Sequence, residues 1–447
     1  MVQHWKRGLK PLFSYALWTI AIGLIALGIV RVVRDILKAP NWPGQGTDLS
    51  VYFSAARHVA EGQSPYLNPA DPANPYGYPP LFADLIALLR SVLGEGMLWA
   101  IWPIASAAAL FASIALMMRS FGWKAPWVAV AGVFGLLING HITRSDLFHG
   151  QPHFFLILLI LTGIIAFQKG RALTGALTWA AVIVCKPFAG IFVLALVRRG
   201  QYREAIYTLG ASAGLFVASF LPFAANAVDA FKGWIDATRF HTSFPNVAKP
   251  TNEAFNGFFT RIFSETPFSS PWIAAPGVIP WLAASLTLLA LTAAWFSVSG
   301  KAARESVEPE ERGARDMVEF SAALGFILCF GPLMEGPHVF MLLPGLFGAT
   351  MIAERRWRLN APGKALWLAA ALCWTGVLGL FLIPFENALT NPFGLGHLQG
   401  AKIILSLPFG LAVAAGCVAS LVALRADRAW ERHHLPRPSF VQREPVS

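Results

Sequence analysis

The chain has 447 residues, of which 55% are hydrophobic and only 13% are charged. Soluble domains carry about 25% charged residues, so the composition excludes a soluble globular protein. The net charge of +11 would suit a nucleic-acid partner. However, most basic residues lie between apolar runs in the segments that the positive-inside rule places in the cytoplasm. The composition therefore predicts an integral membrane protein that binds membrane lipids and no nucleic acid.

Apolar runs of about 17–25 residues, the length that crosses the hydrocarbon core, recur along the whole chain. The first run is too long for the core of a signal peptide, roughly 7–15 residues, and has no small-residue cleavage site. Both termini are then cytoplasmic, and we expect residues 425–447 to form a basic, disordered tail. The predicted spans are 12–33, 97–118, 125–141, 152–168, 172–185, 188–197, 204–224, 276–298, 317–334, 339–353, 365–385 and 400–424.

This topology depends on how residues 79–93 and residues 172–197 are assigned. Residues 79–93 are too few for a span and are predicted to form a short helix on the outer surface. Residues 172–197 are predicted to form a hairpin of two half-length helices that meet at Lys186-Pro187, because proline breaks a helix interior. The alternative topology inverts both choices and places Arg119 and Lys124 outside.

The first outer loop, residues 34–96, carries an acid directly before a short amphipathic helix at 49–61. Asp48 is either the N-cap of that helix or, as an ionised carboxylate at the membrane surface, a general base. Three tyrosines of the same loop, Tyr52, Tyr66 and Tyr78, are candidate substrate ligands. The arrangement suits an enzyme that acts on a lipid-borne substrate.

Further polar residues interrupt the apolar sequence beyond this loop. Asp146, His149 and Gln151 lie between two spans and are candidate ligands of sugar hydroxyls or phosphate, although an Arg144–Asp146 ion pair is the alternative. Lys186 lies in an apolar stretch, where a lysine is costly and points to function. It either binds an anion at the outer leaflet or reaches from a helix end toward the headgroups.

The later candidates lie in the long loop 225–275 and at the start of a late span. If this segment is helical, Asn252, Asn256 and Arg261 lie close to one face, and arginine binds phosphate in a bidentate manner. A solvated interfacial helix is the alternative. Glu335 and His338 stand at a span end, where His338 is either structural or a phosphate ligand. In the predicted topology all these clusters lie on the outer face, which indicates one site.

The four cysteines are far apart in apolar segments, and no Cys/His spacing or Asp/Glu cluster predicts a metal site. We therefore expect no cofactor and no dependence on a metal ion. No polar stretch is long enough for a separate soluble domain, so residues 1–424 are predicted to form a single transmembrane domain.

Four stretches resemble glycosyltransferase family 87 of the GT-C superfamily, the polyprenyl-phosphate-mannose-dependent mannosyltransferases of bacterial membranes. They are Gly46-Thr47-Asp48 through Tyr66, Tyr78-Pro79-Pro80, Gly150-Gln151 with Lys186-Pro187 and Arg198-Arg199, and Pro332 through His338. His153, the Asn252-Glu253-Ala254 segment and Pro337 depart from the family pattern.

The resemblance implies an all-α polytopic membrane protein, a GT-C-type bundle of about 12 transmembrane helices with short interfacial helices in the first outer loop. It implies that Asp48 is the catalytic base and that Lys186 and His338 contact the donor phosphate. Arg261 is a further candidate for that contact. The predicted reaction is an inverting transfer of a hexose, mannose above all, from a polyprenyl-phosphate donor to a lipid or glycan hydroxyl on the periplasmic face of the bacterial inner membrane.

Two other functions remain open from the sequence. A flippase for a lipid-linked sugar should have its site near the membrane midplane between repeated halves, and the sequence has no internal repeat. An O-antigen polymerase or ligase should have an arginine-rich outer loop, whereas loop 225–275 is only mildly basic.

Overall fold

The computed structural model describes residues 2–38, 47–67, 74–121, 123–249, 251–266, 270–305, 307–382 and 408–434. Within these ranges the regular elements are α-helices and short 3-10 helices, with no β-strand. This confirms the prediction of an all-α protein.

The first half of the fold, which carries most of the candidate residues, has thirteen elements. They are α1 (Val2–Lys38), α2 (Asp48–Ala60), α3 (Pro80–Leu93), α4 (Glu95–Ser120), α5 (Trp127–Ile138), α6 (His141–His149), α7 (His153–Gln168), α8 (Ala172–Cys185), η1 (Pro187–Gly190), α9 (Ile191–Arg198), α10 (Tyr202–Ala218), η2 (Leu221–Asn226) and α11 (Ala227–His241).

The second half contains the remainder of the bundle. Its elements are α12 (Phe244–Val247), α13 (Phe255–Phe263), η3 (Pro276–Val278), α14 (Ile279–Ser297), α15 (Lys301–Glu305), α16 (Pro309–Phe330), η4 (Gly336–Leu342), α17 (Leu343–Arg358), α18 (Lys364–Leu382) and α21 (Pro408–His434).

Six described segments are long and apolar enough to cross a membrane, so the protein is multi-pass. They are Ser14–Leu37, Glu95–Ser120, Tyr202–Phe223, Pro276–Ser297, Gly336–Arg358 and Gly410–Asp427. A seventh candidate is α5 with α6, which are bent by 74° where we expected the single span 125–141. Four shorter apolar helices account for other expected spans, and the count of about twelve remains a prediction.

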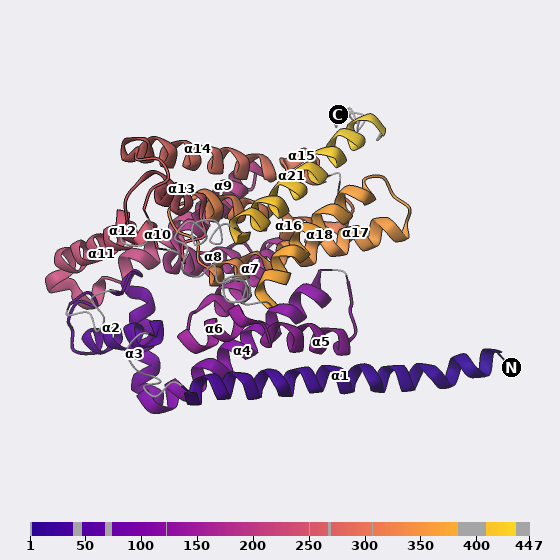
Figure 1. Cartoon of the computed structure of the whole chain (residues 1–447), viewed down its shortest axis with the longest axis horizontal. Coiled ribbons are helices and arrows are strands. Elements are labelled where there is room, and N and C mark those ends of the chain that lie inside the picture. The colour runs from indigo at the N-terminus through magenta and orange to yellow at the C-terminus, as the bar shows by residue number, and fades with distance from the viewer. Residues whose placement is uncertain are drawn as a thin grey trace, which may run out of the picture.

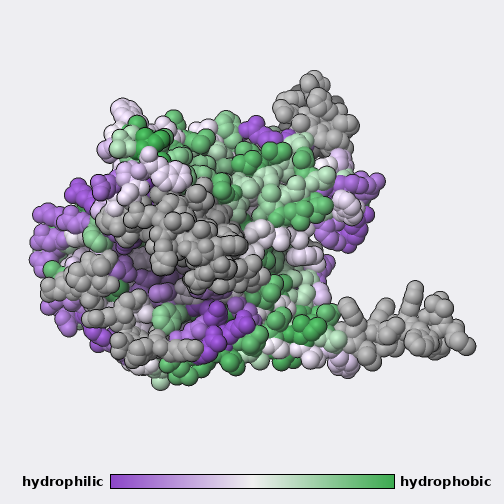
Figure 2. All heavy atoms as spheres, in the orientation of Figure 1, coloured by the Kyte–Doolittle hydropathy of each residue, from purple (hydrophilic) through white to green (hydrophobic). Residues whose placement is uncertain are grey.

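The surface has the polarity of a membrane protein. Apolar residues cover the long sides of the molecule, whereas polar residues gather at the two ends, around α11 and at the turn between α17 and α18 (Figure 2). Large apolar side chains such as Ile22 on α1, Leu209 on α10 and Leu288 on α14 are exposed. Such a belt is stable only against lipid.

The helices α2, α3 and α11 lie at one end of the molecule, and the beginning of α1 and the end of α21 lie at the other (Figure 1). The C-terminal end differs from the sequence prediction. Residues 425–434 continue α21, because Asp427 is buried and bonded to Arg315, Arg356 and Trp367. Residues 435–447 lie outside the described residues, as do 400–407 of the last predicted span.

The predicted break at Lys186-Pro187 is present between α8 and η1. At the other end of this segment, Gln168 at the end of α7 and Arg199 at the end of α9 both bond to Asp316 on α16. The two basic ends of the segment 172–197 therefore lie together, as the hairpin predicts. Lys186 is left at the opposite end, near α2.

Candidate functional site

Asp48 is the first residue of α2 and its carboxylate is free for a role other than capping. The N-cap is Thr47, whose side-chain oxygen accepts a hydrogen bond from the Ser50 backbone N–H at 3.3 Å. The sequence interpretation of Asp48 as the cap is therefore corrected. At the first turn, the carboxylate is stabilised by the partial positive charge of the helix N-terminus.

Two carboxamides hold the Asp48 side chain. Asn74 Nδ2 donates to Oδ1 at 2.9 Å, and Gln151 Nε2 donates to Oδ2. Gln151 follows Gly150, which ends α6 in the left-handed conformation with φ 71° and lies against Leu49. This turn brings a residue 103 positions away in the sequence onto the start of α2.

Gln151 also connects Asp48 to a cluster of buried tyrosines. Its Oε1 accepts hydrogen bonds from the hydroxyls of Tyr52 at 3.1 Å and Tyr78 at 3.3 Å. The Tyr66 hydroxyl donates to the Tyr78 carbonyl at 2.7 Å. Burial raises the pKa of Tyr52 and of Tyr78, so both are neutral donors at physiological pH and fix the orientation of the Gln151 amide.

The other side of Tyr78 faces a pair of nitrogen donors. Lys186 Nζ lies 4.8 Å from the centre of the Tyr78 ring and 3.3 Å from His338 Nε2. His338 Nδ1 accepts the Glu335 backbone N–H at 3.0 Å. A backbone amide can only donate, so a neutral His338 carries its proton on Nε2.

The Nε2–H of His338 and the ammonium group of Lys186 are then two donors directed at each other. Such an arrangement is favourable when both donate to a shared anion, and phosphate oxygens are strong acceptors for these groups. Burial, followed by the charge of Asp48, raises the pKa of Glu335, and Lys186 and Lys249 oppose this shift. Asp48, Lys186 and Glu335 therefore share one electrostatic environment.

Asp146 and His153 form a buried pair behind this cluster. Asp146 Oδ1 lies 2.8 Å from His153 Nδ1, and the His153 ring packs edge-on against His338 with ring centres 5.2 Å apart. Arg144 pairs with Asp35, not with Asp146. Asp146 therefore supports His338 through His153, and the alternative of an Arg144–Asp146 ion pair is wrong.

Arg261 is not brought to the Lys186–His338 pair. It is 1% exposed, and its guanidinium donates to the carbonyls of Lys249 at 2.7 Å and Asn252 at 3.1 Å. Burial lowers its pKa to about 10, so it remains a cation at neutral pH. Backbone carbonyls occupy the donor groups that we expected to bind phosphate.

Asn252 is likewise structural in this arrangement. Its Nδ2 donates to the Pro332 carbonyl at 2.8 Å, and its Oδ1 accepts the Met334 N–H at 3.0 Å. It thereby fastens the long loop to the segment that carries Glu335 and His338. Of the other two candidates, His149 ends α6 with its ring against Phe148, and Asn256 lies in the first turn of α13. Asn252 precedes α13, so it is not part of the helical face that we expected it to share with Asn256.

Sequence reasoning missed two residues of the site, Asn74 and His153. Asn74 lies in the same loop as the tyrosines, four residues before Tyr78, but a lone asparagine in a loop carries no signal of its partner. His153 stands directly after Gly150-Gln151-Pro152 and was singled out only as a departure from the family pattern. Both become visible once distant segments are packed together.

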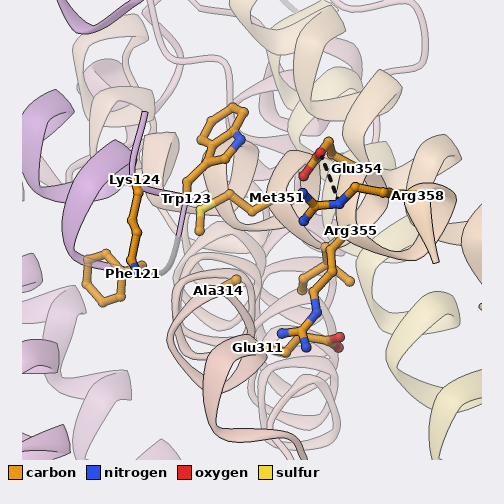
Figure 3. A pocket seen from close by; sticks show the side chains of 10 residues that line it. Phe121, Trp123, Lys124, Glu311, Ala314, Met351, Glu354, Arg355 and Arg358 are labelled. Atoms are coloured by element: carbon orange, nitrogen blue, oxygen red, sulfur yellow. Dashed lines mark ion pairs between the residues drawn. The ribbon is translucent and has the colours of Figure 1, made fainter. Parts of the chain in front are cut away.

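Within the described residues, no group of three or more His, Cys, Asp or Glu side chains is arranged to hold a metal ion. A cavity of about 570 Å³ lies elsewhere, between Phe121, Trp123 and Lys124 on one side and the start of α16 and the end of α17 on the other (Figure 3). Trp102 on α4 donates to the Gly150 carbonyl at the site, and Phe121 directly follows the last residue of α4. At 1.5 Å per helical residue, the two are roughly 28 Å apart. This cavity is therefore at the opposite end of the bundle from Asp48.

The apolar helices define a multi-pass membrane protein, and comparison with known proteins gives its family. The model of glycosyltransferase family 87 matches residues 76–336. Because the match covers more than half of the chain, the protein belongs to glycosyltransferase family 87 and is a membrane glycosyltransferase. Searches of curated proteins and of solved structures found no match.

Proposed function

We propose that the protein transfers a hexose, mannose in the first instance, from a polyprenyl-phosphate donor to a hydroxyl of a lipid or glycan acceptor. The reaction inverts the anomeric centre and takes place on the outer face of the bacterial inner membrane. The observation that carries the proposal is the continuous contact from the Asp48 carboxylate through Gln151 and Tyr78 to the paired donors of Lys186 and His338.

Asp48 acts as the general base. It takes the proton of the acceptor hydroxyl as that oxygen attacks the anomeric carbon. The bond from the anomeric carbon to the phosphate oxygen breaks, and its electron pair leaves with polyprenyl phosphate. Each oxygen of Asp48 accepts one amide hydrogen bond, and a carboxylate oxygen has a second acceptor position for the incoming hydroxyl.

Lys186 and His338 stabilise the leaving group. The phosphate gains one negative charge as the bond breaks, so it needs positive and hydrogen-bonding partners and no acid. Preorganised donors in a poorly hydrated site serve this purpose best. Asp146 and His153 keep His338 in place, and Tyr52, Tyr66 and Tyr78 form the wall between the base and the phosphate groups.

Membership of a glycosyltransferase family favours sugar transfer over the flippase alternative. The polymerase or ligase alternative differs in its donor, because it would use a diphosphate-linked glycan where we propose a monophosphate-linked single sugar. Supplying both donors to the same membranes separates these two reactions.

Replacing Asp48 by Asn tests the proposal. Labelled polyprenyl-phosphate mannose is supplied to membranes that contain the wild type or the variant, and transfer to lipid or glycan is measured. We expect Asp48→Asn to lower turnover by roughly 10²- to 10⁴-fold, the usual contribution of a general base, while donor binding persists.

The matched control is Asp236→Asn, an exposed acid of α11 whose side chain is 73% accessible. It should transfer sugar at the wild-type rate. Near-normal turnover of Asp48→Asn would refute the role of the base.

A further inference from the structure

The helix α11, far from the first outer loop in sequence, packs directly on that loop. A Cβ atom at Gly233 would lie 2.9 Å from Cβ of Tyr66, and one at Gly77 would lie 2.6 Å from Cδ2 of His241. The helix therefore approaches the loop at both ends of the segment between Tyr66 and Tyr78. At each contact one partner is a glycine, Gly233 or Gly77, and this lets the helix and the loop approach closely.

His241, the last residue of α11, adds a polar anchor to this contact. Its Nε2 lies 2.9 Å from the Pro75 carbonyl, across 166 residues of sequence. A carbonyl only accepts, so Nε2 must carry the proton. Burial lowers the pKa of His241, although the bond to Pro75 opposes this shift. The imidazole is then neutral at physiological pH and remains a donor.

The anchored peptide is adjacent to the residue that holds the base. Pro75 follows Asn74, whose side chain donates to Asp48 Oδ1 at 2.9 Å. Fixing the Pro75 carbonyl limits the movement of the Asn74 backbone, and hence the position of its carboxamide. The base of the Tyr66 side chain lies against α11 at Gly233, and the hydroxyl at its other end donates to the Tyr78 carbonyl.

We propose that His241 is a positioning residue, which through Pro75 and Asn74 sets the orientation of the Asp48 carboxylate toward the acceptor hydroxyl. The inference rests on the proposed function of Asp48 as the base. A misplacement of a catalytic group by about 1 Å can cost on the order of 100-fold in rate, so a bond outside the reacting centre has a measurable effect.

Three variants of the full-length protein test the inference. His241→Leu removes the donor and keeps an apolar side chain. His241→Gln keeps an N–H donor near the position of Nε2. Gly77→Ala adds a methyl group where the imidazole lies. Arg239→Gln, on the exposed face of the same helix with a side chain 78% accessible, is the control.

In the sugar-transfer assay, we expect His241→Leu and Gly77→Ala to lower kcat by roughly 10- to 100-fold with little change in the KM for the donor. His241→Gln and the control should stay within about 3-fold of wild type. In an Asn74→Ala background, His241→Leu should cause little further loss, because both changes act on the same contact. Equal losses in both backgrounds would overturn the proposed route through Asn74.

Hydrogen exchange of the purified protein gives a readout that needs no sugar donor. The amides of residues 76–78 should exchange faster in His241→Leu than in wild type and Arg239→Gln. If His241→Leu exchanges faster than wild type but the wild type itself transfers no mannose, the proposed function is refuted, while the anchoring of Pro75 by His241 stands. Normal kcat in His241→Leu, beside an active wild type, would refute the positioning role.

Discussion

Among the residues that the structure describes, two neutral carboxamides hold the carboxylate that we propose as the base. Asn74 and Gln151 each donate one amide N–H to Asp48. A guanidinium in the same place would form charge-assisted, bidentate bonds and compete with the acceptor hydroxyl for the same oxygens. The amides fix the direction of the carboxylate and leave acceptor positions for the substrate.

A second acid, Asp84, lies near the site and tests how burial in residues 34–96 affects the stability of the protein. Asp84 lies on α3, and burial raises its pKa to about 7. Its Oδ1 is buried and has no hydrogen-bond partner within the described residues. In the folded protein the Asp84 carboxyl therefore stays protonated up to about pH 7. In the unfolded chain the same carboxyl ionises at about pH 4.

It follows that the protonation of Asp84 stabilises the fold at low pH, and that this contribution is lost as the pH rises to about 7. Asp84→Asn should raise the stability at pH 8, by on the order of 1 kcal/mol after allowance for its partial exposure. At pH 5 the gain should be smaller. Thermal unfolding in detergent at both values measures this, with exposed Glu61→Gln as the control. A gain that is equal at the two pH values would contradict the prediction.

At the scale of the element, the start of α2 sets where the base stands. Thr47 caps the helix through Ser50 N–H, and its carbonyl accepts the Ser50 hydroxyl at 2.6 Å. Because Asp48 is the next residue, loss of the cap loosens the turn that carries the carboxylate.

We expect Thr47→Ala to destabilise the protein by about 1 kcal/mol, the usual value of an N-cap, and to lower sugar transfer. Thr47→Ser keeps the hydroxyl and should retain both properties. Unfolding midpoints and initial rates of the two variants provide the comparison. Equal behaviour of Ala and Ser at this position would show that the cap does not hold the base.

At the scale of the whole molecule, buried ion pairs join α16 to the end of α9, at the end of the bundle opposite Asp48. Arg199 pairs with Asp316 at 2.8 Å and with Glu319 at 2.6 Å, and all three side chains are nearly inaccessible. Buried ions are tolerated only in pairs, because an unpaired charge in a medium of low polarity is very unfavourable.

Arg199→Leu should therefore destabilise the protein by about 3–5 kcal/mol, and the loss should appear in thermal unfolding in detergent or nanodiscs. Arg203→Gln, an exposed arginine at the start of α10, is the control and should have little effect. The donor KM of folded Arg199→Leu protein should not change, because the cluster is remote from Asp48.

Much of this protein follows from local patterns. Long apolar runs predict helices because each backbone group must be bonded within its own segment in lipid. Likewise, Lys186-Pro187 predicts a helix break because proline lacks a donor. The sequence also singles out Asp48, Gln151, Lys186 and His338 as candidates, since polar residues among apolar ones are rare enough to be noticed.

The tertiary structure alone decided which of these residues meet. Asn74 reaches Asp48, His153 supports His338, and Arg261 faces carbonyls of its own loop. The end of α21 is also helical where charge predicted a disordered tail, because Asp427 is buried against arginines. The reason is physical: capping and hydrophobicity act within a few residues, whereas hydrogen bonds across a hundred residues depend on how helices pack.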